Sequence, residues 1–241
     1  MTTNGTGANG TSGDVTSRVR ARPPSAKNTP PTRRVGRVAE EAQLRARLEL
    51  ARVIGDHTEE RATGRQLAER LASLDAEIDA AIELALRTLA AADDPELRHA
   101  LVGWLEGLGE PGLAASELRK IRRDDDAVAA AAVLVRIGVL HARAGDAFGA
   151  QEALAEASTL DEIDALSLEL LGAIAEWAPE ALTPRAGAEA YVRAAKRRGY
   201  AGDAEGEIED LLRAFELDPS SPLATAALAA AYAARDRASA A

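Results

Sequence analysis

The amino-acid sequence predicts an all-α fold that is built from a succession of short helices. Hydrophobic residues make up 46% of the 241 residues, but aromatic residues make up only 3%, and alanine and leucine supply most of the apolar content. Alanine loses no side-chain entropy in a helix and leucine loses little, so this composition favours helices. Extended runs of Val, Ile, Thr and aromatic residues, which mark strands, do not occur in the sequence. A recurrent pairing of glycine with an acidic residue divides the chain into helix-sized segments.

The first 37 residues have a different composition from the rest of the chain. Gly, Pro, Ser, Thr and Asn dominate residues 1–37, and no apolar periodicity is present there. Such a segment cannot bury enough apolar surface to offset the entropy of ordering, so we expect a disordered tail at 1–37 and a helical domain at 38–241. The tail carries seven basic residues and one acid, a net charge of +6, so the remainder carries −16 to give the total of −10. This basic tail is either a hydrated leader without a role or an electrostatic tether to an acidic surface.

Apolar residues at three- and four-residue spacing begin after Val38 and predict the first helix. The apolar positions on one face of this helix are Leu44, Leu48, Ala51 and Ile54. Gly55-Asp56 then ends the helix, because glycine adopts the left-handed conformation at a helix C-terminus and aspartate caps the next N-terminus. The same pairing of glycine with an acidic residue recurs at Gly109-Glu110, Gly145-Asp146 and Gly202-Asp203.

Prolines and acidic clusters supply the remaining breaks between helices. They lie near Pro95, Asp124, Asp161, Pro184 and Pro219. Together with the Gly-acid pairs, these breaks predict about eleven helices of roughly 12–18 residues each.

The stretch Arg136–Leu160 recurs at two other places in the chain. A shift towards the N-terminus that aligns its Gly145 with Gly109 also aligns Leu154 with Leu118. A shift towards the C-terminus that aligns Gly145 with Gly202 also aligns Leu154 with Leu211, and we call this second alignment the Gly145–Gly202 register. A sequence that repeats as helix pairs predicts a solenoid, because one pair cannot bury its own apolar face and the units must stack.

Small residues stand at fixed positions of this repeat. Two antiparallel helices joined by a tight turn approach closely only where the contact residues are small. We therefore expect Gly138 and Ala150 where the first helix faces the second, and Ala157 where the second helix meets the next unit. The large residues that fill the space around them are Leu134, Ile137 and Leu154.

This repeat resembles the tetratricopeptide repeat (TPR), whose pattern places a bulky residue, Leu-Gly, an aromatic, a Gly-Asp-like turn, Ala, a large residue and Ala at fixed spacing. The matching positions here are Leu134, Ile137-Gly138, His141, Gly145-Asp146, Ala150, Leu154 and Ala157. The resemblance extends over roughly residues 95–235, ends with a clear second helix at Asp210–Pro222, and implies a right-handed α-solenoid of TPR-like helix pairs. The segment "EWAPEALTPRAG" breaks the phase, so the pairing of helices around 162–200 stays open.

By this resemblance, the function would be protein–protein interaction, with a peptide or helix bound in the concave groove that the first helices line. The partner-binding residues that it implies are Val139, Arg143, Glu169, Trp177 and Lys196. The family's best-known clamp, which binds a C-terminal carboxylate, uses Lys, Asn and Arg at set positions of the first helices. Those positions here are His99, Val135, Val139, Glu169 and Lys196, so that clamp is not reproduced.

A rival hypothesis is a structural or regulatory protein whose stacked faces drive self-assembly. The sequence ends one helix into its last unit, so Leu223–Ala234 would pack against a partner or a second copy. Alternatively, the chain would be the N-terminal segment of a longer repeat array.

No constellation of side chains predicts an enzyme, a metal site or a cofactor. The chain has no cysteine, which excludes disulfides and thiolate sites. Its three histidines are far apart in sequence, and His141 occupies an aromatic position of the repeat, which favours a packed core residue over a ligand. Trp104 and Trp177 are candidate groove anchors, with core packing as the alternative.

The charge distribution and the apolar runs of the sequence limit which other partners we expect. The basic clusters Arg119–Arg123 and Arg193–Arg198 lie at helix ends, where cations complement the helix dipole, with partner contact as the alternative. An acidic body repels phosphate, so we expect no binding of nucleic acid. The longest apolar run, Ala127–Val135, is too short to span a membrane, and we expect a cytoplasmic protein.

Overall fold

The computed structural model of the chain describes residues 31–74, 77–121 and 126–239. Within these ranges the backbone forms eleven α-helices and no strand, so the predicted all-α fold is confirmed. The helices are α1 (Pro31–Ile54), α2 (His57–Ala72), α3 (Ile78–Ala91), α4 (Pro95–Leu108), α5 (Pro111–Lys120), α6 (Ala127–Arg143), α7 (Ala147–Leu160), α8 (Leu166–Trp177), α9 (Pro184–Tyr200), α10 (Ala204–Leu217) and α11 (Pro222–Ser239). The chain divides into two compact units, Met1–Ala42 and Gln43–Ala241, and the boundary between them lies inside α1.

The first helix begins earlier than the sequence predicts. α1 starts at Pro31, so residues 31–37, which we expected to belong to a disordered tail, are helical. Proline is well tolerated in the first turn of a helix, where its fixed φ suits the helix and its missing N–H group has no partner to lose. The rest of the predicted tail, residues 1–30, lies outside the described residues, and the expectation for it stays a prediction.

Four tight turns have the geometry that the Gly-acid pairs predict. Their glycines lie in the left-handed region of backbone conformation, with φ between 74° and 82°. These glycines are Gly55, Gly109, Gly145 and Gly202, and they join α1 to α2, α4 to α5, α6 to α7 and α9 to α10. The aspartates that follow the first, third and fourth of them accept hydrogen bonds from backbone N–H groups in the first turn of the next helix, so they cap it.

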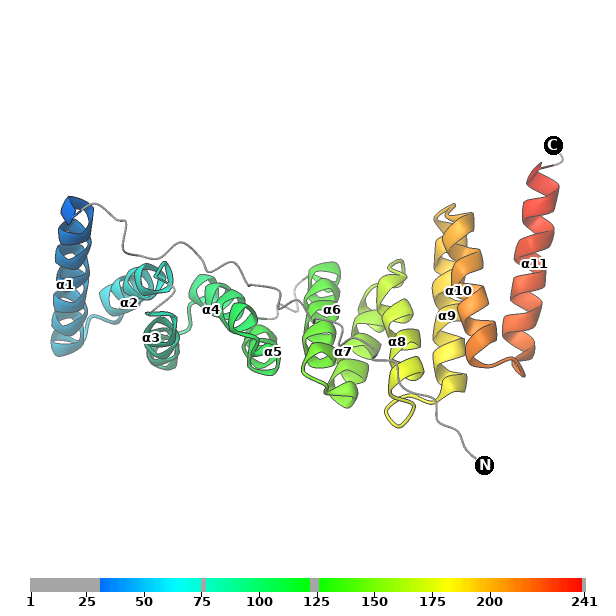
Figure 1. Cartoon of the computed structure of the whole chain (residues 1–241), viewed down its shortest axis with the longest axis horizontal. Coiled ribbons are helices and arrows are strands. Elements are labelled where there is room, and N and C mark those ends of the chain that lie inside the picture. Colours follow the sequence, from blue (N-terminus) through cyan, green and yellow to red (C-terminus); the bar gives the residue numbers. More distant parts are fainter. Residues whose placement is uncertain (1–30, 75–76, 122–125, 240–241) are drawn as a thin grey trace, which may run out of the picture. The chain divides into compact units, whose positions relative to one another are not determined.

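Helices α6 to α8 and α9 to α11 are two copies of one three-helix unit (Figure 1). α6 and α9 both contain 17 residues, and α7 and α10 both contain 14. The Gly145–Gly202 register aligns the first residue of α6 with that of α9, and the first residue of α7 with that of α10. The same register carries α8 onto residues 223–234, which lie within α11. The repeat that the sequence shows for two helices therefore extends over three.

The helix pairing around residues 162–200 depends on α9. On one side α9 packs against α8 so closely that a Cβ atom at Gly172 would collide with the ring of Tyr191. Tyr191 is fully buried, and its hydroxyl donates a hydrogen bond to Oε1 of Glu176 at 2.6 Å. At its C-terminal end α9 continues through the Gly202 turn into α10. α9 is therefore both the partner of α8 and the first helix of the next pair.

Gly138 has the role that its position in the repeat predicts. A Cβ atom at Gly138 would lie 2.6 Å from Cγ of Leu154, so only glycine permits this approach of α6 and α7. The expectation for Ala157 is wrong, because this residue belongs to a core cluster with residues of α2 to α6 rather than of the following unit. Ala150, by contrast, lies in the cluster that α7 shares with α8 and α9. The two alanines are separated by about 10 Å along the helix, so opposite ends of α7 serve different neighbours.

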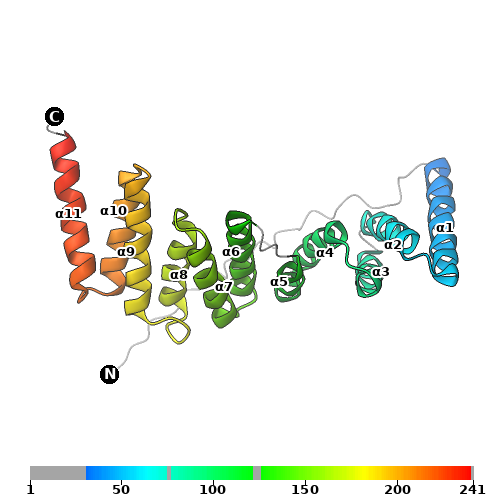
Figure 2. The same ribbon diagram turned by 180° about the vertical axis from the view of Figure 1, so that it is seen from behind.

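From α2 to α11 each helix packs against the next one in the chain (Figure 1 and Figure 2). Alanine and leucine make up most of the buried residues at these contacts. A buried salt bridge adds to the contact of α4 with α5, where Nη1 of Arg98 lies 2.6 Å from Oε2 of Glu117. Consecutive packing, turn glycines and small contact residues are the properties of a solenoid of TPR-like helix pairs.

Candidate groove for a protein partner

An apolar groove with a volume of about 350 Å³ lies between α6 and α8, and we call it the α6–α8 groove. Three of the five predicted partner-binding residues line it, namely Val139 and Arg143 on α6 and Trp177 at the end of α8. The other lining residues are Gly138, Ala142, Leu154, Leu170, Ala173 and Ile174.

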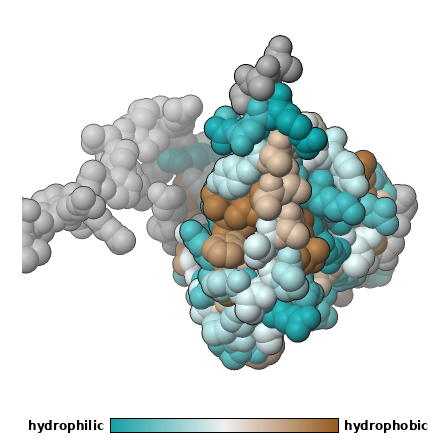
Figure 3. Space-filling view, turned by 90° about the vertical axis from the view of Figure 1, so that its right-hand side faces the viewer, coloured by the Kyte–Doolittle hydropathy of each residue, from teal (hydrophilic) through white to brown (hydrophobic). Residues whose placement is uncertain are grey.

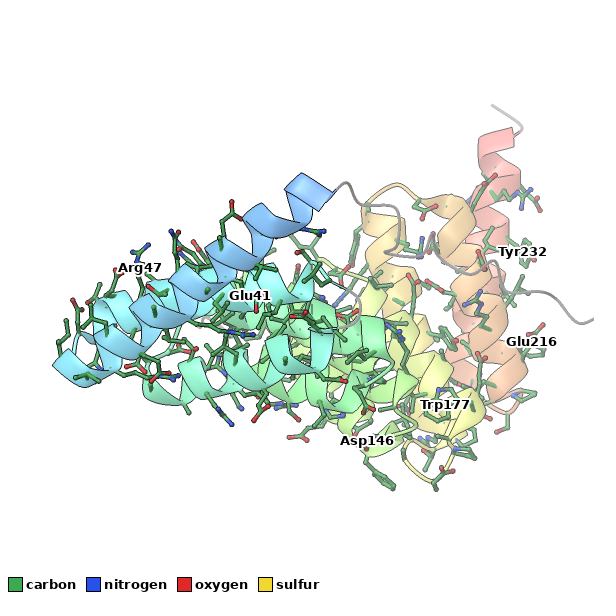
Figure 4. The ribbon with its side chains drawn as sticks, turned by 60° about the vertical axis from the view of Figure 1, so that its left-hand side comes forward. Glu41, Arg47, Asp146, Trp177, Glu216 and Tyr232 are labelled. Atoms are coloured by element: carbon green, nitrogen blue, oxygen red, sulfur yellow. The ribbon has the colours of Figure 1, made fainter. Side chains whose placement is uncertain are left out.

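The walls of this groove combine packed and exposed apolar side chains. Leu154 and Ile174 are each only 2% exposed, whereas Val139 is 39% and Trp177 is 50% exposed. Trp177 is the last residue of α8, and its label in Figure 4 marks that end of the helix. A half-exposed tryptophan beside fully packed side chains still has a large apolar area to remove from water, which is typical of a binding anchor.

Arg143 is the charged residue among those that line the groove. Its Nη1 lies 3.6 Å from Oε2 of Glu106, which is too long for a hydrogen bond. Glu106 also pairs with Arg136, two turns earlier on α6. Because one carboxylate serves two guanidinium groups, these three side chains together carry a net charge of +1 beside the groove.

Glu169 does not line the groove, because it belongs to an ion-pair network between helices. Its Oε1 accepts a hydrogen bond from Nε of Arg198 at 2.7 Å. The same guanidinium donates to Oδ2 of Asp203 at 2.7 Å and lies 3.1 Å from Oδ2 of Asp210. Arg198 therefore joins α8 to the turn before α10 and to α10 itself, and Glu169 serves an internal contact.

Asp210 is the buried member of this network and is only 3% exposed. Burial raises the pKa of its carboxyl to about 6; the charge of Glu169 acts in the same direction, and the charges of Arg198 and Arg213 act against it. The network consequently holds a carboxyl group that titrates near neutral pH.

Lys196 also lies apart from the α6–α8 groove. It lines a second groove, between α9 and α11, and its Nζ is 5.8 Å from the centroid of the Tyr200 ring. That distance is within the range of a cation–π interaction. The structure thus brings three of the five predicted residues together and places the other two at separate sites.

Other residues that the sequence suggested as candidates make contacts within the fold. Trp104 packs against two core clusters, so it has the core-packing role that was the alternative to a groove anchor. Nδ1 of His141 lies 2.8 Å from Oδ2 of Asp146, in the turn between α6 and α7. Arg197 donates hydrogen bonds to backbone carbonyl groups at the end of α7, including that of Ser158 at 3.1 Å. This cation complements the dipole of a neighbouring helix rather than of its own.

Within the described ranges, no group of three or more His, Cys, Asp or Glu side chains could hold a metal ion. None of the helices in that part of the chain combines the length and apolar character that are needed to cross a membrane.

Most residues on the α8 side of the groove were not predicted from the sequence. Leu170 and Ala173 lie two turns and one turn before Trp177 and line the same groove. Their counterparts in the Gly145–Gly202 register, Ala227 and Ala230, line the second groove. Applying the Gly145–Gly202 register to the third helix as well would have identified Leu170 and Ala173 from the sequence.

The fold and the groove define the class of protein, which is an all-α repeat protein of TPR-like helix pairs with an apolar groove between α6 and α8. No protein-family model matches the chain, and no curated protein matches it either. Among solved structures, the chain is similar to MamA, with 20% sequence identity, coverage of 70% of this chain and 94% of that chain, and a TM-score of 0.44.

Two further solved structures have a comparable similarity. One is BtubC (BKLC) from P. vanneervenii, with 16% identity, coverage of 84% of this chain and 92% of that chain, and a TM-score of 0.42. The other is YrrB, described as a TPR protein with an unusual peptide-binding site, with 17% identity, coverage of 73% and 96%, and a TM-score of 0.37. Because all three TM-scores are below 0.5, the assignment to TPR-like repeats rests on the helix pairs of this chain itself.

Proposed function

We propose that the chain is a protein-interaction scaffold that binds an apolar segment of a partner, a peptide or a helix, in the α6–α8 groove. The observation that carries this proposal is an apolar groove of about 350 Å³ in whose wall Trp177 is 50% exposed. Val139 and Arg143 complete the binding surface. In this role the chain acts by binding and performs no catalytic step.

The groove has a size and composition suited to docking of side chains. Sites for bound molecules usually measure roughly 300–1,000 Å³, so this groove is large enough for one or two bulky apolar side chains. Tryptophan and arginine are enriched among the residues that dominate binding energy at interfaces. A helix or an extended peptide presents apolar side chains at regular spacing, which matches a groove between two helices.

Trp177 can report on binding directly. The chain contains two tryptophans, so Trp104→Phe leaves Trp177 as the only one. We expect short synthetic peptides with Leu or Phe anchors to shift the emission of Trp177 to the blue, because the bound peptide removes the indole ring from water.

Val139→Glu tests whether the peptides bind in this groove. It should weaken their binding about tenfold or more, because it places a charge against the apolar anchor. Leu113→Glu is the matched control, since Leu113 is 57% exposed on α5 and does not line the groove. Equal affinities of the two variants, or no emission shift with any peptide, would overturn the proposal.

A second candidate function is self-association through α11. Of the residues described in this helix, only Ala224 and Ala231 are buried, and an apolar stripe along α11 faces the viewer in Figure 3. A helix that is apolar all round is normally buried. If α11 pairs with a second copy, light scattering will give a mass that rises with concentration, and Tyr232→Lys, at a 41% exposed position, will prevent the rise. A constant monomer mass would exclude this candidate.

The remaining expectations from the sequence stay predictions. They are a cytoplasmic location and the lack of nucleic-acid binding.

A further inference from the structure

The second groove occupies the same register of the repeat as the α6–α8 groove. It lies between α9 and α11, has a volume of about 520 Å³, and is called the α9–α11 groove here. In the Gly145–Gly202 register, every residue that lines the α6–α8 groove has a counterpart that lines the α9–α11 groove. On the first helices, for example, Val139 corresponds to Lys196 and Arg143 to Tyr200.

The two grooves share architecture but differ in side chains. Leu211 replaces Leu154 in the wall contributed by the second helix, so the apolar contact is retained. The exposed aromatic residue moves from Trp177 on the third helix to Tyr200 on the first helix, where it is 81% exposed. Each groove therefore offers an apolar channel with one accessible aromatic ring.

The charges beside the two grooves are also alike. Arg136 and Arg143 on α6 share one carboxylate, as described above. On α9 the equivalent face carries Arg193 and Lys196, and neither forms a salt bridge within the described residues. Glu207 is the carboxylate that lines the α9–α11 groove. Each set of two cations and one carboxylate has a net charge of +1, on a chain whose total charge is −10.

We propose that the two grooves form a tandem docking surface for one acidic partner segment, in which each groove receives an apolar side chain and the cations beside it pair with neighbouring carboxylates. The chemistry of this partner rests on the function proposed for the α6–α8 groove, whereas the second groove is an independent site. Charge complementarity selects an acidic segment over a basic one, because like charges facing each other across an interface are costly. Two linked anchors bind more tightly than one, because the second docks at a high effective concentration.

The experiment uses the full chain and synthetic peptides of two designs. Single-anchor peptides contain one Leu or Phe among Asp and Glu residues, and double-anchor peptides join two such segments through Gly/Ser linkers of graded length. A basic series replaces the acids by Lys and Arg. We expect the best double-anchor acidic peptide to bind about a hundredfold more tightly than the single-anchor peptide. We expect the basic series to bind at least about tenfold more weakly than the acidic series.

Variants on α11 and α9 test whether the tighter binding of double-anchor peptides comes from the α9–α11 groove. Ala230→Glu places a charge in this groove, and Ala229→Glu, at the adjacent exposed position that does not line it, is the matched control. A second pair is Lys196→Ala and its control Arg185→Ala, an 82% exposed cation on the same helix. Ala230→Glu should lower the affinity for the double-anchor peptide to that for the single-anchor peptide. Lys196→Ala should lower the affinity for the double-anchor peptide severalfold, and the two control variants should leave this affinity unchanged.

The outcomes separate this inference from the proposed function. If Val139→Glu weakens the single-anchor peptide but Ala230→Glu acts like its control, the scaffold function stands and the tandem surface is overturned. If Ala230→Glu matters and Val139→Glu does not, the second groove stands and the function proposed for the first one fails. A double-anchor peptide that gains nothing at any linker length overturns the tandem. So does an Ala230→Glu effect on self-association mass without an effect on peptide binding.

Discussion

Gly138 and Gly103 are both helical glycines, but their surroundings have opposite consequences for substitution. A Cβ atom at Gly138 would lie 2.6 Å from Cγ of the buried Leu154, whereas a Cβ atom at Gly103 would meet nothing within 4 Å. We expect Gly138→Ala to lower the free energy of unfolding by about 1–3 kcal/mol through overpacking between α6 and α7. Gly103→Ala is the control and should raise it by up to about 1 kcal/mol, because alanine is the better helix former.

Urea unfolding followed by circular dichroism measures both glycine variants. If Gly138→Ala has a midpoint equal to that of the unsubstituted chain, the contact of Gly138 with Leu154 does not limit the distance between the two helices.

The buried salt bridge between Arg98 and Glu117 gives a second prediction at the scale of single residues. Both side chains are only 9% exposed, and Arg98 has a second partner in Asp93, whose side chain is 60% exposed. Glu117→Ala leaves Arg98 with this exposed partner alone, so it should cost about 1–3 kcal/mol of unfolding free energy. Glu83→Ala removes an exposed pair with Arg87 and should cost about 0.5 kcal/mol or less. Similar losses for the two variants would contradict the burial argument.

At the scale of helices, the contacts of α9 explain why its basic cluster has three different roles. Arg197 complements the end of α7, Arg198 joins α8 to α10, and Lys196 lies in a groove. These three consecutive residues point in different directions, because successive side chains of a helix are rotated by about 100°. The cluster consequently does not form a single basic patch.

The network around Arg198 makes the stability of this region depend on pH. The pKa of Asp210 is raised to about 6 in the folded chain, so the folded state binds more protons than the unfolded state between about pH 4 and pH 6. The contribution of Asp210 to the free energy of unfolding therefore falls as pH rises through this range, by about 3 kcal/mol in total.

Asp210→Asn tests this pH dependence, because asparagine cannot ionise. We expect the unfolding free energy of the unsubstituted chain, relative to that of the variant, to fall from pH 4 to pH 7 and then to stay constant. Chemical unfolding at a series of pH values measures the difference and cancels the titration of the other groups. A difference that is independent of pH would contradict the raised pKa.

At the scale of the whole molecule, charge separates the chain into a basic beginning and an acidic body. Residues 38–241 carry a net charge of −16, and counterion release favours DNA binding only where clustered cations replace the counterions. We expect a chain that starts at Val38 to show no salt-sensitive binding to duplex DNA in fluorescence anisotropy. Tight binding that weakens as salt rises would contradict this expectation.

The sequence alone determined most of the helices and the turns of this protein. Glycine followed by an acidic residue is a local signal, because only glycine adopts positive φ without strain and the carboxylate caps the next helix. All four such pairs, at Gly55, Gly109, Gly145 and Gly202, form the predicted left-handed turns, but Glu110 after Gly109 makes no capping hydrogen bond with its side chain. The early start of α1 at Pro31 escaped prediction, because proline is compatible both with a loop and with the first turn of a helix.

Only the tertiary structure decided which side chains share a groove. Periodicity places a residue on a face of its own helix, but the rotation of that helix against its neighbours depends on packing. The close contact of Gly172 with Tyr191 fixes α8 against α9, which leaves Trp177 in the groove with Val139 and turns Glu169 towards Arg198. Such contacts join residues far apart in the chain, and a local sequence pattern carries no information about them.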